Sequence, residues 1–447
     1  MRRRRINLKA ILADEDLRRE LMVSTIQATQ AREGIETSRE QADRAYYVVN
    51  EADKSSFFRL RLMRAGKSER DKRHLTFVEQ IQNRDSVIRF DVARRDFRFI
   101  DGAPLAYDRI GIISGTFTDY APLETRASIH QGVITRDDPR YLRSFWEVMP
   151  NSDARPWKPL HKGGGFSRFY YDTDLVIDWS QKSQAQMHRL RDTTLYFKKG
   201  LTWPLRTQRG LNVRQMESGC VFSHKGGGIL LDGIDQAYVL GLLNSSYIEY
   251  IALCLASFGS WEVRVLRAIP VPDANGLESS EISRLAIEIH DIKESWDRGN
   301  EVSTRFHSPW ILSIPGRSYS FLERLSDLAE IEAVREARIQ EFYVTLNDEV
   351  YKLYSIPDTT RAIIEETLGE RPPEVLWPQM EGKTTDQKRM EHIWRLLSYA
   401  VKRVIEADED GIVPFHSAGG EPPLLDRARR ELAALFPNQD SDQIEVD

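Results

Sequence analysis

The residue pattern of the chain changes at Pro272, and this change constrains the fold more than any other feature. Residues 129–272 hold short segments of strand-forming residues, interrupted by glycine-rich turns. Beyond Pro272 the apolar residues recur at helical intervals, as in the stripe from Ile393 to Val404. We therefore expect an α+β (mixed α/β) domain flanked by N-terminal and C-terminal helical regions.

The same patterns predict individual elements. Short strands are expected at residues 175–179, 194–198, 220–223 and 229–231, and strand-like pieces at 97–100 and 110–114. Helices are expected at residues 236–256, 321–342 and 424–435, around the 393–404 stripe, and twice within about the first 65 residues. A chain of 447 residues exceeds one ordinary domain. We expect an N-terminal helical region (1–75), the α+β domain (76–275) and an acidic helical C-terminal region (276–447).

The net charge of −5 conceals a polarised chain. Residues 140–225 carry 15 lysines and arginines against 7 acidic residues, whereas residues 276–447 carry 20 against 34. A basic segment beside an acidic one is typical of a nucleic-acid-binding unit attached to something else. The charge pattern therefore favours a polyanionic partner, although the overall balance argues against one.

Apolar residues make up 41% of the chain and charged residues 29%, a profile typical of soluble globular proteins. No stretch approaches the roughly 18 consecutive apolar residues that a membrane span requires, and the basic N-terminus lacks the apolar segment of a secretory signal. The two cysteines, Cys220 and Cys254, cannot form a disulfide framework or a cysteine-rich zinc site. We expect a cytoplasmic protein with no membrane partner.

Two copies of His-Lys-Gly-Gly-Gly lie at residues 161–165 and 224–228. Backbone N–H groups of such loops can hold phosphate oxygens while the lysine adds charge. Neither copy continues into Gly-Lys-Ser/Thr, so neither is a nucleotide-binding P-loop. The competing interpretation is a tight β-turn, and the sequence leaves both open.

Basic and aromatic residues alternate around these loops. Lysine and arginine neutralise phosphates, arginine also reads guanine edges, and aromatic rings stack on displaced bases. A solvated basic face over core aromatics explains any single residue as well, but the segregated charge favours nucleic-acid contact for the group. The DNA-contacting candidates are Arg136, Arg140, Arg143, Lys162, Gly163, Gly164, Arg168, Trp203, Arg206, Arg209 and Lys225.

The sequence offers no motif for catalysis or metal binding. The nine histidines show no HExxH or paired metal spacing, no GxSxG occurs, and neither cysteine has a histidine placed for nucleophilic work. Asp137 and Asp138 are adjacent, but the further acidic residue and strand lysine of a nuclease site cannot be assigned. We therefore expect no catalytic residue and no metal site.

The region around the loops resembles a known family. Gly102-Ala-Pro-Leu-Ala-Tyr107 is similar to the GxPxAY element that follows the catalytic domain of PglX (BREX phage-defence) and type IIG adenine-specific DNA methyltransferases. Residues 132–143 resemble the family's GLxTGDNxRFLR element, and residues 162–171 its KGGxxRKWYG element. Further weak elements continue the family's order at residues 145–148, 176–179, 200–204, 219–223, 241–245, 259–263 and 269–272. Residues 348–354 also resemble its helical IDxxVYxLYG element.

The resemblance implies a TaqI-like C-terminal specificity domain, the unit that reads the DNA site for the methyltransferase. Family enzymes also carry an Asn/Asp-Pro-Pro-Tyr/Phe motif that holds the flipped adenine. This chain lacks that tetrapeptide, since neither Pro-Pro pair, 372–373 or 422–423, precedes a tyrosine or phenylalanine. Arg136 and Asp138 also replace the family's glycine and asparagine, which predicts a different local turn. The chain thus resembles a specificity half without its catalytic half.

Together these observations predict a sequence-specific DNA recognition component of a restriction–modification or BREX-like phage-defence system, without catalytic activity of its own. Its expected partners are double-stranded DNA and a separate adenine-specific methyltransferase, with a nuclease or a second copy of the chain as further candidates. No cofactor is expected in this chain, because S-adenosylmethionine belongs to the partner. Two alternatives stay open: a C-terminal fragment of an S-adenosylmethionine-dependent adenine methyltransferase, or a structural adaptor of a defence complex that binds no DNA.

Overall fold

The computed structural model describes residues 19–20, 23–24, 27, 38–40, 42, 56–60, 89–93, 110–148, 156–190, 192–207, 209–256, 260–314, 321–417 and 419–436. The chain divides into two compact units, Met1–Asp119 and Tyr120–Asp447. The expected acidic C-terminal region therefore shares the second unit with most of the expected α+β domain.

The first unit contains strands β1 (Ser56–Leu60) and β2 (Arg89–Ala93), which pair antiparallel, and helix α5 (Ile110–Asp119). The few described residues between positions 19 and 42 are helical apart from Ser38, as expected there. The strand predicted at 110–114 is wrong, because these residues form the first half of α5. Their isoleucines favour a strand locally, but the longer context overrides that preference. The piece predicted at 97–100 lies outside the described residues.

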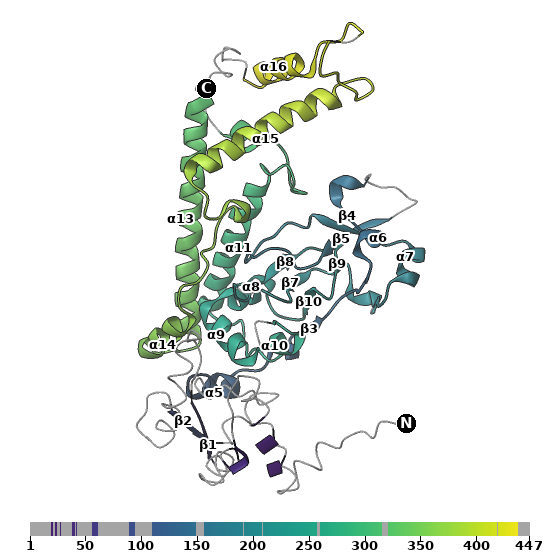
Figure 1. Ribbon diagram of the computed structural model, residues 1–447. Helices are drawn as coiled ribbons and strands as arrows, with labels where there is room; N and C mark the ends of the chain where they lie inside the picture. Colours follow the sequence, from purple (N-terminus) through teal and green to yellow (C-terminus); the bar gives the residue numbers. More distant parts are fainter. Residues whose placement is uncertain are drawn as a thin grey trace. The chain divides into compact units, whose positions relative to one another are not determined.

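The second unit contains two four-stranded sheets (Figure 1). The first is antiparallel, in the order β3-β10-β7-β8, and consists of β3 (Ala127–His130), β7 (Gly200–Pro204), β8 (Arg214–Met216) and β10 (Gly226–Leu231). The second has the order β4-β6-β5-β9, with only β5 and β9 parallel, and consists of β4 (Leu142–Ser144), β5 (Trp157–His161), β6 (Leu175–Asp178) and β9 (Val221–Phe222). The strands predicted at 175–179, 220–223 and 229–231 are confirmed.

The strand predicted at 194–198 is wrong. Thr193–Leu195 form a short 3-10 helix instead, in which the side chain of Asp192 accepts a backbone N–H of the first turn at 2.9 Å. The next residue, Tyr196, lies edge-on to Trp179 with ring centroids 5.3 Å apart, and both rings are buried in the core of the second sheet. Tyr196, a residue type common in strands, here packs into the core from the end of a 3-10 helix instead.

A single helix predicted at 236–256 is present as two, α8 (Gln236–Asn244) and α9 (Ser246–Leu255), bent by 71° at Ser245. Ser245 has an extended backbone (φ −75°, ψ 158°), and its hydroxyl accepts the N–H of Ile248, so it caps α9. Among the described residues, no single helix has the length and apolarity to cross a membrane; α8 and α9 meet those criteria only as this bent pair.

Helices make up most of the remainder of the second unit. Helix α11 packs against both α8 and α13, and Figure 1 shows α11 and α13 side by side. The longer helices are α11 (Leu277–Asp297), α13 (Phe321–Leu353), α14 (Asp358–Leu368), α15 (Thr385–Glu406) and α16 (Leu424–Leu435). The short ones are α6 (Asp138–Tyr141), α7 (Gln181–Gln186), α10 (Val263–Arg267), α12 (Trp310–Ser313) and the 3-10 turns Leu123–Thr125, Phe145–Glu147 and Pro378–Met380. The expected α+β core with flanking helices is confirmed.

Candidate functional site

The two His-Lys-Gly-Gly-Gly copies lie against each other, although 63 residues separate their starting positions, 161 and 224. A Cβ atom added to Gly226 would stand 2.7 Å from the backbone N of Gly163, and one added to Gly163 would stand 3.0 Å from the carbonyl oxygen of Lys225. Any side chain at Gly226 would therefore push the two loops apart. The repeated glycines allow two backbones to meet.

The second copy is the tight β-turn that the sequence left open. The N–H of Gly226 donates to the carbonyl of Ser223 at 3.3 Å, and the N–H of Lys225 donates to the Ser223 hydroxyl at 3.1 Å. From Gly226 onward the chain runs as β10, between β3 and β7. Its glycines belong to the sheet, and only the exposed Lys225 faces solvent at the turn.

The first copy is an irregular loop held from behind by one arginine. Gly163 and Gly164 have positive φ angles of 105° and 82°. The guanidinium of the buried Arg214 donates to the carbonyls of Gly163 and Gly165, and its Nε donates to the carbonyl of Ser167 at 2.9 Å. Burial lowers the pKa of Arg214 to about 10, so the side chain stays charged at neutral pH. Arg214 was missed as a site residue because its spacing resembles that of any other basic residue.

This arrangement leaves the amide groups of the loop unused. Within the described residues, the N–H groups of Gly163, Gly164 and Gly165 have no hydrogen-bond acceptor, while the carbonyls of Gly163 and Gly165 bind Arg214. Successive N–H groups in turn conformations can form a concavity that accepts anions. Because Gly163 and Gly164 have positive φ angles, we take the first copy as the candidate phosphate site.

Further basic side chains lie on these loops and on the segments that contact them. Lys162 forms an ion pair with Asp138. Burial raises the pKa of Asp138, but hydrogen bonds from Lys162 and Thr135 outweigh it and hold the pKa below the ordinary 3.8. The N–H of Leu205 donates to the carbonyl of Lys225 at 2.9 Å, which brings the next residue, Arg206, beside that turn.

We call Arg136, Lys162, Arg206 and Lys225, with Gly163 and Gly164, the basic corner. Arg136 lies two residues from Asp138 and has a positive φ of 63°, the backbone conformation that a glycine at this position would adopt most readily. The different turn expected here stays a prediction. Arg136, Arg206 and Lys225 are exposed, and Lys162 is half-buried. Four predicted cations thus lie on the two glycine loops or on the segments that contact them.

Arg140 and Arg143 lie farther along the same segment. The exposed Arg140 donates to the side chain of Gln186, and Arg143 donates to the carbonyls of Pro139 and Leu142 at 2.5 and 2.6 Å. Both side chains are at least partly accessible, and both have only neutral partners among the described residues.

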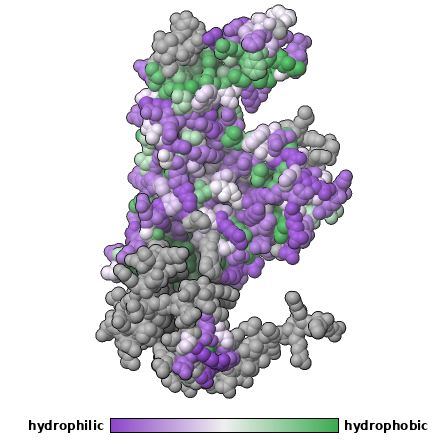
Figure 2. Space-filling model, in the orientation of Figure 1, coloured by the Kyte–Doolittle hydropathy of each residue, from purple (hydrophilic) through white to green (hydrophobic). Residues whose placement is uncertain are grey.

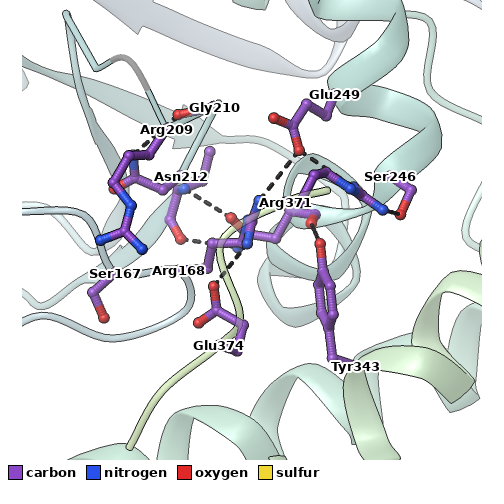
Figure 3. Close-up of polar contacts among 12 residues, drawn as sticks. Ser167, Arg168, Arg209, Gly210, Asn212, Ser246, Glu249, Tyr343, Arg371 and Glu374 are labelled. Atoms are coloured by element: carbon purple, nitrogen blue, oxygen red, sulfur yellow. Dashed lines mark hydrogen bonds and ion pairs between the residues drawn. The ribbon is translucent and has the colours of Figure 1, made fainter. Parts of the chain in front are cut away.

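The side chains of three other predicted DNA-contacting residues already bind other groups of the protein. Arg168 is fully buried, with its guanidinium 2.9 Å from Glu374 and 3.2 Å from Glu249 (Figure 3). Trp203 is buried, and its indole N–H donates to the carbonyl of Trp261 at 2.8 Å. Arg209 forms a bidentate ion pair with Glu381.

In this conformation a phosphate or base does not reach Arg168 or Trp203. We therefore leave these two residues, and the paired Arg209, out of the basic corner.

The ion pair of Arg168 belongs to a larger buried network. Glu374 also accepts a hydrogen bond from Lys293 at 3.0 Å, and Arg371 contacts Glu249 at 3.3 Å. Burial raises the pKa of Glu374, but Lys293 and Arg168 outweigh it and leave the pKa below the ordinary 4.5. These residues lie far apart in the sequence, so no spacing rule could have indicated the network.

One group of potential metal ligands occurs among the described residues, formed by His290, Asp291 and Glu294 of α11, with ligand atoms within 4.8 Å of one another. His290 is buried, Asp291 is exposed, and the two already contact each other at 2.9 Å within the helix. We assign no ion to it.

The chain is homologous, at modest identity, to two curated adenine-specific methyltransferases. It is 27% identical over 290 residues to BrxX of Escherichia coli O9:H4 (strain HS), which covers 62% of this chain and 22% of that protein. It is 21% identical over 257 residues to PglX of Lacticaseibacillus casei (strain Zhang), which covers 50% of this chain and 21% of that protein. The chain thus matches about a fifth of the length of these relatives. No family model matches it.

Proposed function

We propose that this chain binds double-stranded DNA through the basic corner and reads a target site for adenine-specific methylation in a phage-defence or restriction–modification system. The observation that carries this proposal is the first glycine loop. Its carbonyls are bound by Arg214, its amides are unused among the described residues, and Lys162 and Lys225 stand beside it. The homology to two adenine-specific methyltransferases supports the same role.

The roles of the side chains follow from their chemistry. The loop amides and the two lysines suit phosphate oxygens, because amide donors and a compact ammonium bind a tetrahedral anion without reading sequence. Arg136, Arg140 and Arg206 are exposed, and an arginine can form two hydrogen bonds with the edge of guanine. We therefore assign phosphate contacts to the loop and base contacts to these arginines.

We propose that residues other than these DNA-contacting candidates carry out the methyl transfer. Pro372-Pro373 precedes Glu374, whose carboxylate is buried in ion pairs with Arg168 and Lys293, so this Pro-Pro segment does not fit an adenine pocket. We propose that S-adenosylmethionine is bound by a methyltransferase that this chain directs. The match to a fifth of each relative equally supports a second candidate, in which the chain is the specificity portion of a longer methyltransferase.

The proposal is tested by fluorescence anisotropy with a labelled duplex at several salt concentrations. Lys162→Gln, Arg206→Gln and Lys225→Gln should each weaken binding, and each should reduce the slope of log affinity against log salt by about 1 for every phosphate that the variant no longer neutralises. Arg338→Gln and Lys352→Gln remove exposed cations of α13 and should leave affinity and slope unchanged.

Absence of duplex binding, by the chain alone and together with a co-purified methyltransferase, would refute the proposal. Equilibrium dialysis with S-adenosylmethionine tests whether this chain is catalytic by itself. Both candidates predict that the chain alone does not retain the cofactor.

A further inference from the structure

Helix α15 has apolar side chains on two faces, one buried and one exposed. Leu396, Ala400 and Val404 are buried against the rest of the second unit, as the sequence stripe suggested. A second set of apolar side chains is accessible: Met390 (51% exposed), Trp394 (62%), Leu397 (37%) and Ile405 (42%), with Val401 half-buried between the last two. We call these five residues the outer stripe.

The outer stripe follows one line along the helix. Its successive spacings are four, three, four and four residues, which keep side chains on one face of an α-helix and are the spacings that paired helices bury. Figure 2 shows apolar surface gathered over α15 and α16. A tryptophan and three aliphatic side chains exposed along one line are unusual for a surface that faces only water.

We propose that the outer stripe binds the outer stripe of a second copy of this chain, with the two α15 helices antiparallel. The stripe is nearly symmetric about its own centre, because Met390 and Ile405, and likewise Trp394 and Val401, are equidistant from the point just after Leu397. A two-fold axis through that point sets Met390 against Ile405 of the second copy and Leu397 against its counterpart. Such self-complementarity is what a two-fold interface requires.

The charges beside the stripe favour the same orientation. Glu391 and Lys402 lie along one edge of it, and the antiparallel arrangement brings Glu391 within about one helical turn of Lys402 of the second copy, twice in the dimer. In a parallel pair, this edge of one helix and the same edge of the other lie on opposite sides of the interface, so Glu391 and Lys402 of the two copies would not face each other. Within the helix, Glu391 also pairs with Arg395 at 2.8 Å and Lys402 with Glu406 at 3.7 Å. The charges across the interface therefore favour the antiparallel pair, while the symmetry of the stripe is what indicates a second copy.

The expected dimer is a weak one. The 22 residues of α15 span about 33 Å, and one helix pair of this length buries less than the area of a standard stable interface. We therefore expect a dissociation constant in the micromolar range, so that monomer and dimer exchange with concentration.

Sedimentation velocity of the full chain, from about 1 to about 100 µM, tests the inference. The wild type should shift from monomer to dimer, whereas Trp394→Glu should raise the dissociation constant by roughly 30-fold or more. Ile363→Glu, which places the same charge at an exposed apolar position of α14, should leave it unchanged. A wild type that stays monomeric throughout this range overturns the inference.

A charge exchange tests the orientation. Glu391→Lys and Lys402→Glu should each weaken the dimer by a few fold, and the double variant should restore it because the two charges face each other across the interface. A double variant weaker than either single one contradicts the antiparallel pairing. DNA affinity measured at nanomolar protein should be the same in all these variants, so this inference and the proposed function fail independently.

Discussion

A single buried arginine determines the shape of the glycine loop. Arg214 binds the carbonyls of Gly163, Gly165 and Ser167, and its ring partner Tyr171 lies 4.4 Å from the guanidinium. Because the carbonyl of one residue and the N–H of the next point in opposite directions, fixing the carbonyl of Gly163 inward turns the N–H of Gly164 outward. In the proposed DNA contact, the loop conformation therefore depends on a residue that does not itself touch the phosphate.

Gly163→Ala tests this at the residue scale. Gly163 has φ +105°, and its added Cβ would stand 3.0 Å from the carbonyl of Lys225, so alanine strains the loop and should weaken DNA binding by about 1–3 kcal/mol in the anisotropy titration. The matched control is Gly219→Ala, at φ +89° with nothing within 4 Å of the added Cβ. Alanine at position 219 causes a similar backbone strain but lies outside the basic corner. Equal losses of affinity in both variants would contradict the assignment.

Side-chain burial was the part of the site that the sequence could not supply. Arg168 and Arg206 both belong to the basic segment, yet the first is fully buried and the second is exposed. Their difference depends on Glu374 and Glu249, which reach Arg168 from distant parts of the chain. The loops were predictable because their glycines and lysines are adjacent in sequence, whereas the buried ion pairs were not.

At the scale of elements, the contact between α8 and α11 explains a glycine inside a helix. Glycine weakens a helix by about 1 kcal/mol relative to alanine. An added Cβ at Gly241 would nevertheless stand 2.6 Å from a methyl group of Ile282, and 3.2 Å from its carbonyl oxygen. The close approach of the two helices needs this position to lack a side chain.

Gly241→Ala should therefore destabilise the protein even though alanine is the better helix former. We expect a loss of about 1–3 kcal/mol in the free energy of unfolding, because the added methyl group overpacks a core contact that cannot relax freely. Urea unfolding followed by circular dichroism measures it. Gly115→Ala is the control, because Gly115 is a helical glycine of α5 whose added Cβ would have only one atom within 4 Å, the Asp119 Oδ2 at 4.0 Å. A stabilised Gly241→Ala would show that α8 and α11 can separate.

The elements divide into those set by local pattern and those set by packing. The helix at 424–435 matches α16 residue for residue, since apolar spacing and flanking prolines are local signals. The strand expected at 194–198 failed because Tyr196 is drawn into the core by Trp179, and the single helix at 236–256 failed because Ser245 caps a new helix. In both failures, a contact or a cap outweighed propensity.

At the scale of the whole second unit, the buried network joins segments that are distant in the chain. The carboxylate of Glu374 binds Arg168, which lies between β5 and β6, and Lys293 of α11. The side chain of Gln340 of α13 donates to the backbone carbonyl of Glu374 at 2.5 Å. Removing one partner from such a network leaves the others as unpaired buried charges. The basic segment and the acidic helices are therefore parts of one packed body.

Glu374→Gln should lower the free energy of unfolding at pH 7 by about 3–5 kcal/mol. The pKa of Glu374 is below its ordinary 4.5 in the folded state, so its stabilisation is fully present above pH 4.5 and is lost as pH falls through the folded-state pKa. The gap between wild type and variant should narrow below pH 4.5 in urea titrations. Glu381→Gln breaks the more exposed pair with Arg209 and should cost less than about 1 kcal/mol. An unchanged unfolding midpoint for Glu374→Gln at pH 7 would contradict the network.

The turn at Lys225 has a consequence for protein engineering. Its backbone is fixed on both sides, by Ser223 within the turn and by Leu205 across it, while the lysine side chain is exposed. Any residue that tolerates this turn can take its place without refolding the sheet behind it. Randomising this one codon therefore samples new side chains at the basic corner on an unchanged scaffold, which makes it the first position to vary in a search for altered duplex affinity.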